Sequence, residues 1–184
     1  MKRLKICVDT NIWIDYAWKK TGSNKAKRLL ELLTNVDSKH LLIIPKILEL
    51  ELKYKFIRSK KKDYLVKEED FSTEDFYSND SNKIIFNTKL TQNYKKEIVD
   101  FFDELRTSKK NKIVSNKIDL NQVESLIDKG FEPMDSLIIV QANSANIDYF
   151  VTRDSIARQI SSQKLNWIKM RSISPNKMIQ KLEE

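Results

Sequence analysis

An α/β fold with a mostly parallel sheet is the fold class that this sequence predicts, from three observations. Short apolar runs of strand length alternate with longer segments whose apolar residues recur at helical spacing. The clearest runs, residues 4–8 and 41–44, are largely apolar, as in strands that helices cover on both faces. A length of 184 residues with 40% apolar and 33% charged residues suits one soluble domain, so we expect residues 1–184 to form a single domain.

The first third of the chain predicts two strands and three helices. We expect the strands at residues 4–8 and 41–44 and the helices at residues 10–18, 25–36 and 46–58. Pro45 closes the second strand and opens the helix after it, because proline is tolerated in the first turn of a helix.

The rest of the chain begins with a weaker pattern. Residues 60–90 are strongly charged, first basic and then acidic, before apolar residues recur at helical spacing over residues 91–106. Beyond them the expected strands are 112–115, 149–152 and 167–170, and the expected helices are 119–129, 133–146, 155–163 and 175–182.

Four carboxylates stand where apolar sequence carries them into the protein: Asp9, Glu51, Asp135 and Asp154. Asp9 and Asp154 each follow an expected strand, at the edge of a parallel sheet where ligand crevices form. Glu51 and Asp135 lie among apolar residues on helical segments. Buried acids are costly unless positive charge offsets them, and a chain with one histidine and one cysteine favours a hard divalent cation with oxygen ligands.

Each acid also has an ordinary explanation when it is taken alone. Asp9 suits a helix cap and Asp135 a partner of the helix dipole, whereas Glu51 and Asp154 suit surface charges. Two acids at strand ends together with two on inward helical faces favour a metal site.

The acid expected on the helix at residues 46–58 is a choice between Glu49 and Glu51. If Ile47, Leu50, Tyr54 and Ile57 mark the buried side, Glu51 lies roughly 80° from its centre and Glu49 roughly 120° away. Glu51 is therefore the expected inward acid.

Several classes of protein are disfavoured by what the chain lacks. Only two glycines occur, and neither lies in a phosphate-cradling loop or a dinucleotide fingerprint. The position two residues after Asp9 holds Asn11, whereas a dehalogenase-type phosphotransferase needs a second aspartate there. No membrane span or signal peptide is apparent, and a single cysteine is typical of a reducing cytoplasm, so we expect a cytoplasmic protein with no membrane partner.

Net charge supports a polyanionic partner. The chain carries a formal charge of +8, which favours nucleic acid. The whole chain is rich in lysine, so this charge is supporting evidence alone.

Five segments, in order along nearly the whole chain, resemble the motifs of the PIN-domain nucleases. They are Val8–Ile12, Ile44–Leu52, Asp135–Ile138, Val151–Asp154, and Ile173–Pro175 leading to Met178. The second acid of that family falls six residues after a proline or serine, which is Glu51 here. The stretch from Glu51 to Asp135 is longer than in compact members of the family, which implies an extra helical or irregular insertion around residues 60–110.

The resemblance implies a three-layer α/β/α fold with a mostly parallel sheet of four or five strands. It also implies an endoribonuclease that uses Mg²⁺ or Mn²⁺ to cleave single-stranded RNA. Asp9, Glu51, Asp135 and Asp154 are the expected catalytic and metal-binding residues, with Glu51 as either a ligand or an orienter of water. The residues expected to bind substrate are Thr10, Asn11, Thr152 and Arg153.

The resemblance leaves the biological role open. The toxin of a toxin–antitoxin pair is the leading role, with a protein antitoxin, RNA and a second copy of the chain as expected partners. The alternatives are a processing or decay ribonuclease, a DNA nuclease, a non-catalytic module with the same fold, and a small-molecule phosphatase.

Overall fold

The computed structural model describes most of the chain outside its middle third. The described residues are 3–18, 24–35, 37–52, 55, 100–101, 103–108, 111–162 and 165–184. Clustering of contacts divides the chain into two compact units, one made of Met1–Leu52 and Arg106–Glu184 and the other of Lys53–Leu105. Most of the predicted insertion at 60–110 lies outside the described residues, and the single-domain organisation stays a prediction. Everything below concerns the first unit.

Five parallel strands form one sheet, which confirms the predicted fold class. The strands are β1 (Lys5–Val8), β2 (Leu41–Pro45), β3 (Asn111–Val114), β4 (Tyr149–Val151) and β5 (Arg171–Ile173). Their order across the sheet is β3-β2-β1-β4-β5, and every neighbouring pair is parallel. The central strand β1 is buried at Ile6, Cys7 and Val8, as its apolar sequence requires.

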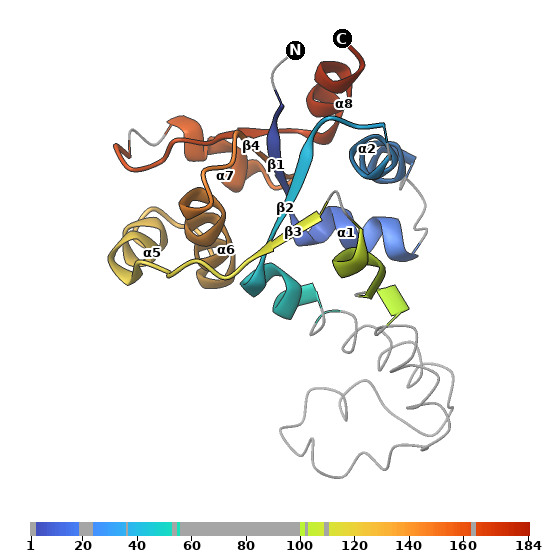
Figure 1. Cartoon of the computed structure of the whole chain (residues 1–184). Coiled ribbons are helices and arrows are strands. Elements are labelled where there is room, and N and C mark those ends of the chain that lie inside the picture. The colour runs from blue at the N-terminus through green and yellow to red at the C-terminus, as the bar shows by residue number, and fades with distance from the viewer. Residues whose placement is uncertain are drawn as a thin grey trace, which may run out of the picture. The chain divides into compact units, whose positions relative to one another are not determined.

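Helices cover both faces of the sheet, which completes the three-layer α/β/α architecture (Figure 1). They are α1 (Thr10–Trp18), α2 (Asn24–Thr34), α5 (Leu120–Ile127), α6 (Pro133–Ser144), α7 (Ser155–Arg158), the 3₁₀ helix η2 (Gln159–Ser162) and α8 (Pro175–Glu183). Residues 46–52, after β2, are helical as well and are called helix 46–52 below. In Figure 1, α1, α2 and α8 lie on one side of the sheet and α5 and α6 on the other.

The apolar residues predicted to be buried on α2 and α6 are buried, and α2 shows the predicted periodicity. Ala26, Leu29, Leu30 and Leu33 are the buried residues of α2, which packs against α1 and α8. On α6 the stripe of Ile138, Ile139 and Ala142 is buried, with 1% of Ile138 and none of the other two exposed. α2 therefore buries the one stripe that its sequence shows. α6 is buried on more than one face, because Val140, Gln141 and Asn143 are buried as well.

The last predicted strand is wrong by four residues. The apolar run Trp167–Met170 precedes the strand, whereas β5 is Arg171–Ile173, which pairs with β4 from Tyr149↔Arg171 to Val151↔Ile173. An edge strand needs hydrogen bonds on one side only and is not fully buried, so its sequence carries little apolar signal. Arg171 is exposed, and Ser172 and Ile173 are half-buried.

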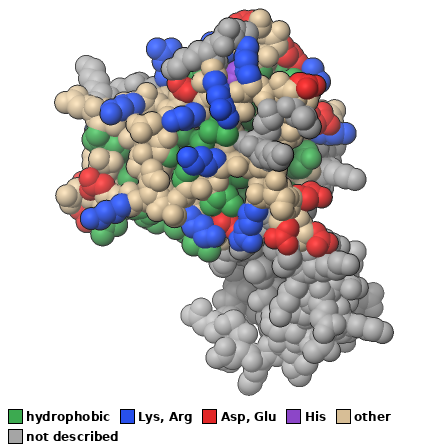
Figure 2. Space-filling model, in the orientation of Figure 1, with side chains coloured by type: hydrophobic (Ala, Val, Ile, Leu, Met, Phe, Trp, Pro, Cys, Tyr) green, Lys and Arg blue, Asp and Glu red, His purple; other side chains and the backbone are tan. Residues whose placement is uncertain are grey.

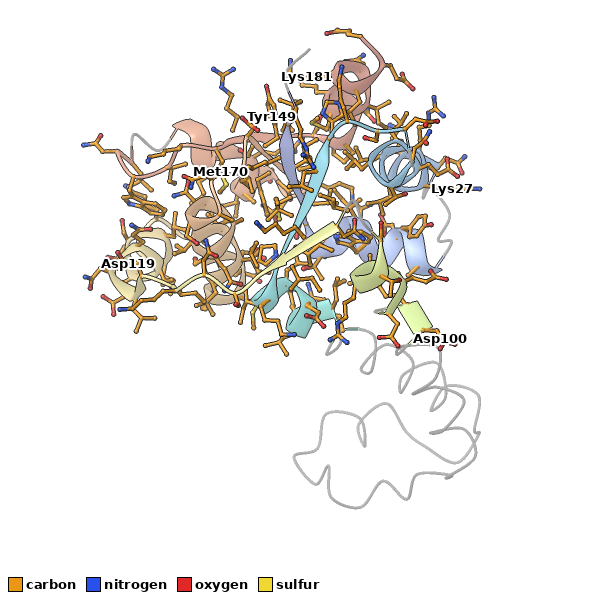
Figure 3. All side chains as sticks on the ribbon, in the orientation of Figure 1. Lys27, Asp100, Asp119, Tyr149, Met170 and Lys181 are labelled. Carbon is orange, nitrogen blue, oxygen red and sulfur yellow. The ribbon has the colours of Figure 1, made fainter. Side chains whose placement is uncertain are left out.

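The C-terminal helix is held against the start of β4. Lys181 Nζ of α8 lies 5.8 Å from the centre of the Tyr149 ring, the distance of a cation–π contact (Figure 3). Among the described residues no helix is long and apolar enough to cross a bilayer.

Candidate active site

The carboxyl edge of the sheet brings residues from distant parts of the chain together. Val8 and Val151 are register partners in the parallel pair β1–β4, so the residues after them leave the sheet side by side. Asp9 follows β1 and donates its backbone N–H to Val151 O at 2.9 Å. Thr152 follows β4 and donates its backbone N–H to Ile173 O of β5 at 3.1 Å. The predicted meeting of these two strand ends is therefore present.

Asp9 is held by a buried threonine. Its side chain is only 5% exposed, and Thr152 Oγ1 donates to Asp9 Oδ2 at 2.7 Å. The same hydroxyl accepts the backbone N–H of Asp154 at 3.0 Å, so it uses its donor and an acceptor at once. Thr152 thereby fixes the direction of the Asp9 carboxylate.

Glu51 is also held by the hydroxyl of a buried threonine. It is 7% exposed, and Thr10, which is fully buried, donates its hydroxyl to Glu51 Oε2. Because Thr10 directly follows Asp9, the two buried acids are linked through adjacent residues of the chain.

Asp154 is the N-cap of α7. Its Oδ1 accepts the backbone N–H groups of Ile156 at 2.6 Å and Ala157 at 2.8 Å, as expected of a capping aspartate. The residue is half-buried, and capping occupies one oxygen of its carboxylate, Oδ1.

Asp135 lies in the first turn of α6 and is half-buried. The buried stripe Ile138, Ile139 and Ala142 begins one turn after it, as the sequence predicts. Its predicted role in the site stays a prediction.

Comparison with known proteins decides the family. The family model described as PIN domain matches residues 6–162, which include all four acids. The chain belongs to the PIN-domain family. Proteins of this family are generally nucleases.

Solved structures share the fold at low sequence identity. The structure of VapBC2 from Rickettsia felis, bound to a DNA fragment from their promoter, has a TM-score of 0.53 and 16% identity, covering 93% of this chain and 98% of that chain. PAE2754 from Pyrobaculum aerophilum has a TM-score of 0.51 and 12% identity, covering 98% of this chain and 96% of that chain. No curated protein sequence matches the chain.

One side chain of this PIN domain, which the sequence pattern does not single out, joins two helices and a loop. Gln141 of α6 is 5% exposed; its Oε1 accepts the Ile47 N–H at 2.9 Å, and its Nε2 donates to Asn116 O at 3.0 Å. Gln141 therefore ties the helix that bears Asp135 to the start of the helix that bears Glu51. Its polar character within an apolar stretch was the available signal.

Arg153 contacts a second acid that the sequence pattern does not single out. Its Nη1 lies 2.5 Å from Asp15 Oδ2, and its Nη2 donates to Asn11 O at 3.5 Å. Asp15 is 9% exposed and lies on α1 between Ile14 and Tyr16, where periodicity gives no functional signal. The ordinary role of Arg153, an ion pair, is present, and its predicted contact with substrate stays a prediction, as does that of Asn11.

The buried side of helix 46–52 differs from the predicted one. Leu50 is 51% exposed, whereas Leu48, Glu49 and Leu52 are fully buried. Glu51 is inward as expected, but the predicted stripe through Leu50 was wrong, and so was the expectation that Glu49 faces outward. Tyr54 and Ile57 lie outside the described residues.

The donor set suits a hard cation. Carboxylates and hydroxyls provide oxygen atoms only, and Mg²⁺ is usually bound through one or two carboxylates while it keeps several waters. No three Asp, Glu, His or Cys side chains of the described part are already arranged as a metal cluster. Asp9 and Glu51, the two buried acids linked through Thr10, would offer oxygen ligands of the kind that Mg²⁺ or Mn²⁺ takes, with water completing the shell.

The cysteine and the histidine contribute nothing to this donor set. Burial, and secondarily the charge of Asp9, raises the pKa of the Cys7 thiol well above its ordinary value, so Cys7 stays protonated. His40 precedes β2 and therefore lies at the opposite edge of the sheet, where its Nδ1 accepts the Leu4 N–H at 3.3 Å.

Proposed function

We propose that this PIN domain is an Mg²⁺- or Mn²⁺-dependent endoribonuclease that cleaves single-stranded RNA, and that it is the toxin of a toxin–antitoxin pair. The observation that carries the proposal is the pair of buried acids Asp9 and Glu51, each with one oxygen fixed by a buried threonine. A buried carboxylate is costly by itself, so a site that retains two of them near a strand edge is suited to a cation.

In this proposal the chain's own residues hold and orient the reacting groups. Asp9, Glu51, Asp135 and Asp154 would hold the cation directly or through water, or orient water beside it. When bound, the cation lowers the pKa of a coordinated water and offsets charge on the phosphate and the leaving group. Thr152 and Thr10 would not touch the cation themselves. They orient the carboxylates of Asp9 and Glu51 through hydrogen bonds.

RNA as the substrate is supported by charge and by the family. A formal charge of +8 favours a polyanion, although Figure 2 shows Lys and Arg side chains spread over the visible face of the described part. Arg153, held by Asp15 beside Asn11, is a candidate contact for the scissile phosphate. We expect such an enzyme to act in the cytoplasm.

The toxin role is supported by the structural similarity to VapBC2. It predicts a protein antitoxin, a homodimer, and a neighbouring reading frame that encodes a small DNA-binding protein. Expression of the chain alone should stop growth, and coexpression of that neighbour should restore it. Growth that the chain leaves unaffected would instead favour a processing or decay ribonuclease.

Direct cleavage assays test the proposed activity. Purified protein should cut end-labelled single-stranded RNA with Mn²⁺ or Mg²⁺, and a chelator should stop the reaction. Preference for single-stranded DNA would make it a DNA nuclease, and hydrolysis of a mononucleotide alone would make it a phosphatase. If the protein binds Mn²⁺ but cleaves none of these substrates, it would be a non-catalytic binding module with the same fold.

A further inference from the structure

Glu49 is a fully buried carboxylate between two cations. It is 0% exposed; its Oε2 lies 2.6 Å from Lys46 Nζ, and its Oε1 is bound by Arg106 Nη2. The side chains of Lys46 and Arg106 are each 42% exposed. The three side chains therefore form an ion pair network that is buried at the acid and open to solvent at the two cations.

Two of these three side chains are cations and one is a carboxylate. Burying a carboxylate is costly, so Glu49 requires both partners, and in return it holds their charged groups in place. Lys46 uses one of its three donors on Glu49. Cations fixed in this manner lose little side-chain freedom when an anion binds, which lowers the cost of binding.

The network lies at the same edge of the sheet as the acids. Lys46 follows Pro45, the last residue of β2, and β2 is the neighbour of β1, which ends before Asp9. Figure 1 shows helix 46–52 and the start of α1 at this same end of the strands. Lys46 therefore lies at the same edge of the sheet as Asp9.

The cationic pair and the metal-binding acids face in different directions. Glu49 and Glu51 are two residues apart, which is a rotation of about 200° around a helix. Glu51 accepts from Thr10 of α1, whereas Glu49 is bound by Arg106, which precedes β3. A phosphate on Lys46 and Arg106 would thus be a different phosphate from the one at the acids.

We propose that Lys46 and Arg106, held by Glu49, bind a backbone phosphate of the RNA strand on one side of the cleavage point. This inference rests on the proposed ribonuclease function and adds a second contact for the same strand. Two cations in one fixed arrangement match a phosphate, which accepts several charge-assisted hydrogen bonds.

RNA binding measured without cleavage tests the site. Fluorescence anisotropy with a labelled single-stranded RNA, in a chelator, compares the parent with Lys46→Gln and Arg106→Gln. Each variant should bind about tenfold more weakly. Each should also reduce the slope of log Kd against log salt by about 0.7, the value for one lost contact with a single strand.

Arg28→Gln is the matched control. Arg28 is also half-exposed and paired with a glutamate, Glu183 at 2.8 Å, but it lies on α2. Its removal should leave Kd nearly unchanged. Arg106→Lys keeps the charge and should retain most of the RNA affinity. This variant separates the loss of positive charge from the loss of the arginine contact with Glu49.

If Arg28→Gln loses as much RNA affinity as Lys46→Gln and Arg106→Gln, the inference is wrong. It is also wrong if folded Lys46→Gln binds RNA as tightly as the parent. If Arg106→Gln does not fold, Lys46→Gln decides, because Glu49 keeps Arg106 as a partner in that variant. The readout is independent of catalysis. A parent that binds RNA through Lys46 and Arg106 but never cleaves would refute the proposed activity and leave this site standing.

Discussion

Thr152 Oγ1 donates a 2.7 Å hydrogen bond to Asp9 Oδ2, although the two residues are 143 positions apart in the chain. The same oxygen accepts the N–H of Asp154, so one buried hydroxyl links two of the four predicted site acids. Thr10 makes the corresponding bond to Glu51. The orientation of the acids therefore depends on two hydroxyl groups that neither touch solvent nor carry charge.

Replacing Thr152 by valine should weaken metal-dependent cleavage by about 10- to 100-fold, the range for lost partners of metal ligands. Valine has a similar shape but leaves Asp9 Oδ2 without its donor and the Asp154 N–H without its acceptor. The Mn²⁺ concentration that gives half of the maximal cleavage rate should be higher in this variant than in the parent. Thr152→Ser, which keeps the hydroxyl, is the control. A valine variant as active as the serine variant would show that this bond does not orient Asp9.

Gln141→Leu should lower the free energy of unfolding by about 1 kcal/mol, because the half-buried Ile47 N–H and the Asn116 carbonyl lose their hydrogen bonds to this buried side chain. Urea denaturation measures the change. The control is Gln180→Leu, since Gln180 is exposed on α8. Equal stability of the two variants would mean that Gln141 does not join these elements in solution.

Cys7 should not react with thiol reagents while the protein is folded. It is 0% exposed, and burial together with the Asp9 charge raises its pKa, so little thiolate forms near neutral pH. Absorbance of a released aromatic thiol follows the reaction, which should proceed once denaturant is added. Rapid labelling of the native chain would contradict the buried position of β1.

Stability should fall as the pH drops below about 6.5, because burial, and secondarily the Lys39 charge, lowers the pKa of His40 from 6.5. The unfolded chain then takes up a proton at a higher pH than the folded chain does. The contribution of neutral His40 to stability is therefore fully present above about pH 6.5. It decreases on acidification until the pH falls below the lowered pKa of His40 in the folded chain.

Urea denaturation at about pH 7.5 and about pH 5.5 measures this dependence. His40 is the one histidine of the chain, so His40→Asn, whose amide oxygen can accept the Leu4 N–H, should reduce the loss at the lower pH. If the parent and His40→Asn lose equal stability, His40 does not titrate in this manner.

The sequence predicted the sheet and most helices because buried parallel strands and amphipathic helices leave strong apolar patterns. Ile6–Val8 and Leu42–Ile44 are almost fully buried, as such runs require. The edge strand β5 was misplaced because Arg171–Ile173 is short, and only part of it is buried. Pattern reasoning therefore succeeded where burial is complete and missed β5, although it placed the other edge strand, β3, within one residue.

The four acids were predicted from strand ends and the family motifs, but their partners were not. Periodicity gives the face of a residue, whereas the bonds from Thr152 and Thr10 join distant segments whose pairing only the fold defines. Glu49 shows the limit most clearly. Its burial depends on Arg106, 57 positions away, so a helical projection placed it on the outside.

Cleavage of single-stranded RNA by Asp9→Asn, with Mn²⁺, tests the central claim most directly. Asparagine keeps the shape of the side chain and removes the charge that a cation requires. The matched control is Asp119→Asn, because Asp119 caps α5 through the Asn121 N–H and asparagine caps equally well (Figure 3). We predict that Asp9→Asn and Asp135→Asn fold normally and show no cleavage above background, while Asp119→Asn retains the parent rate. Parent-like cleavage by both Asp9→Asn and Asp135→Asn would contradict the assigned site.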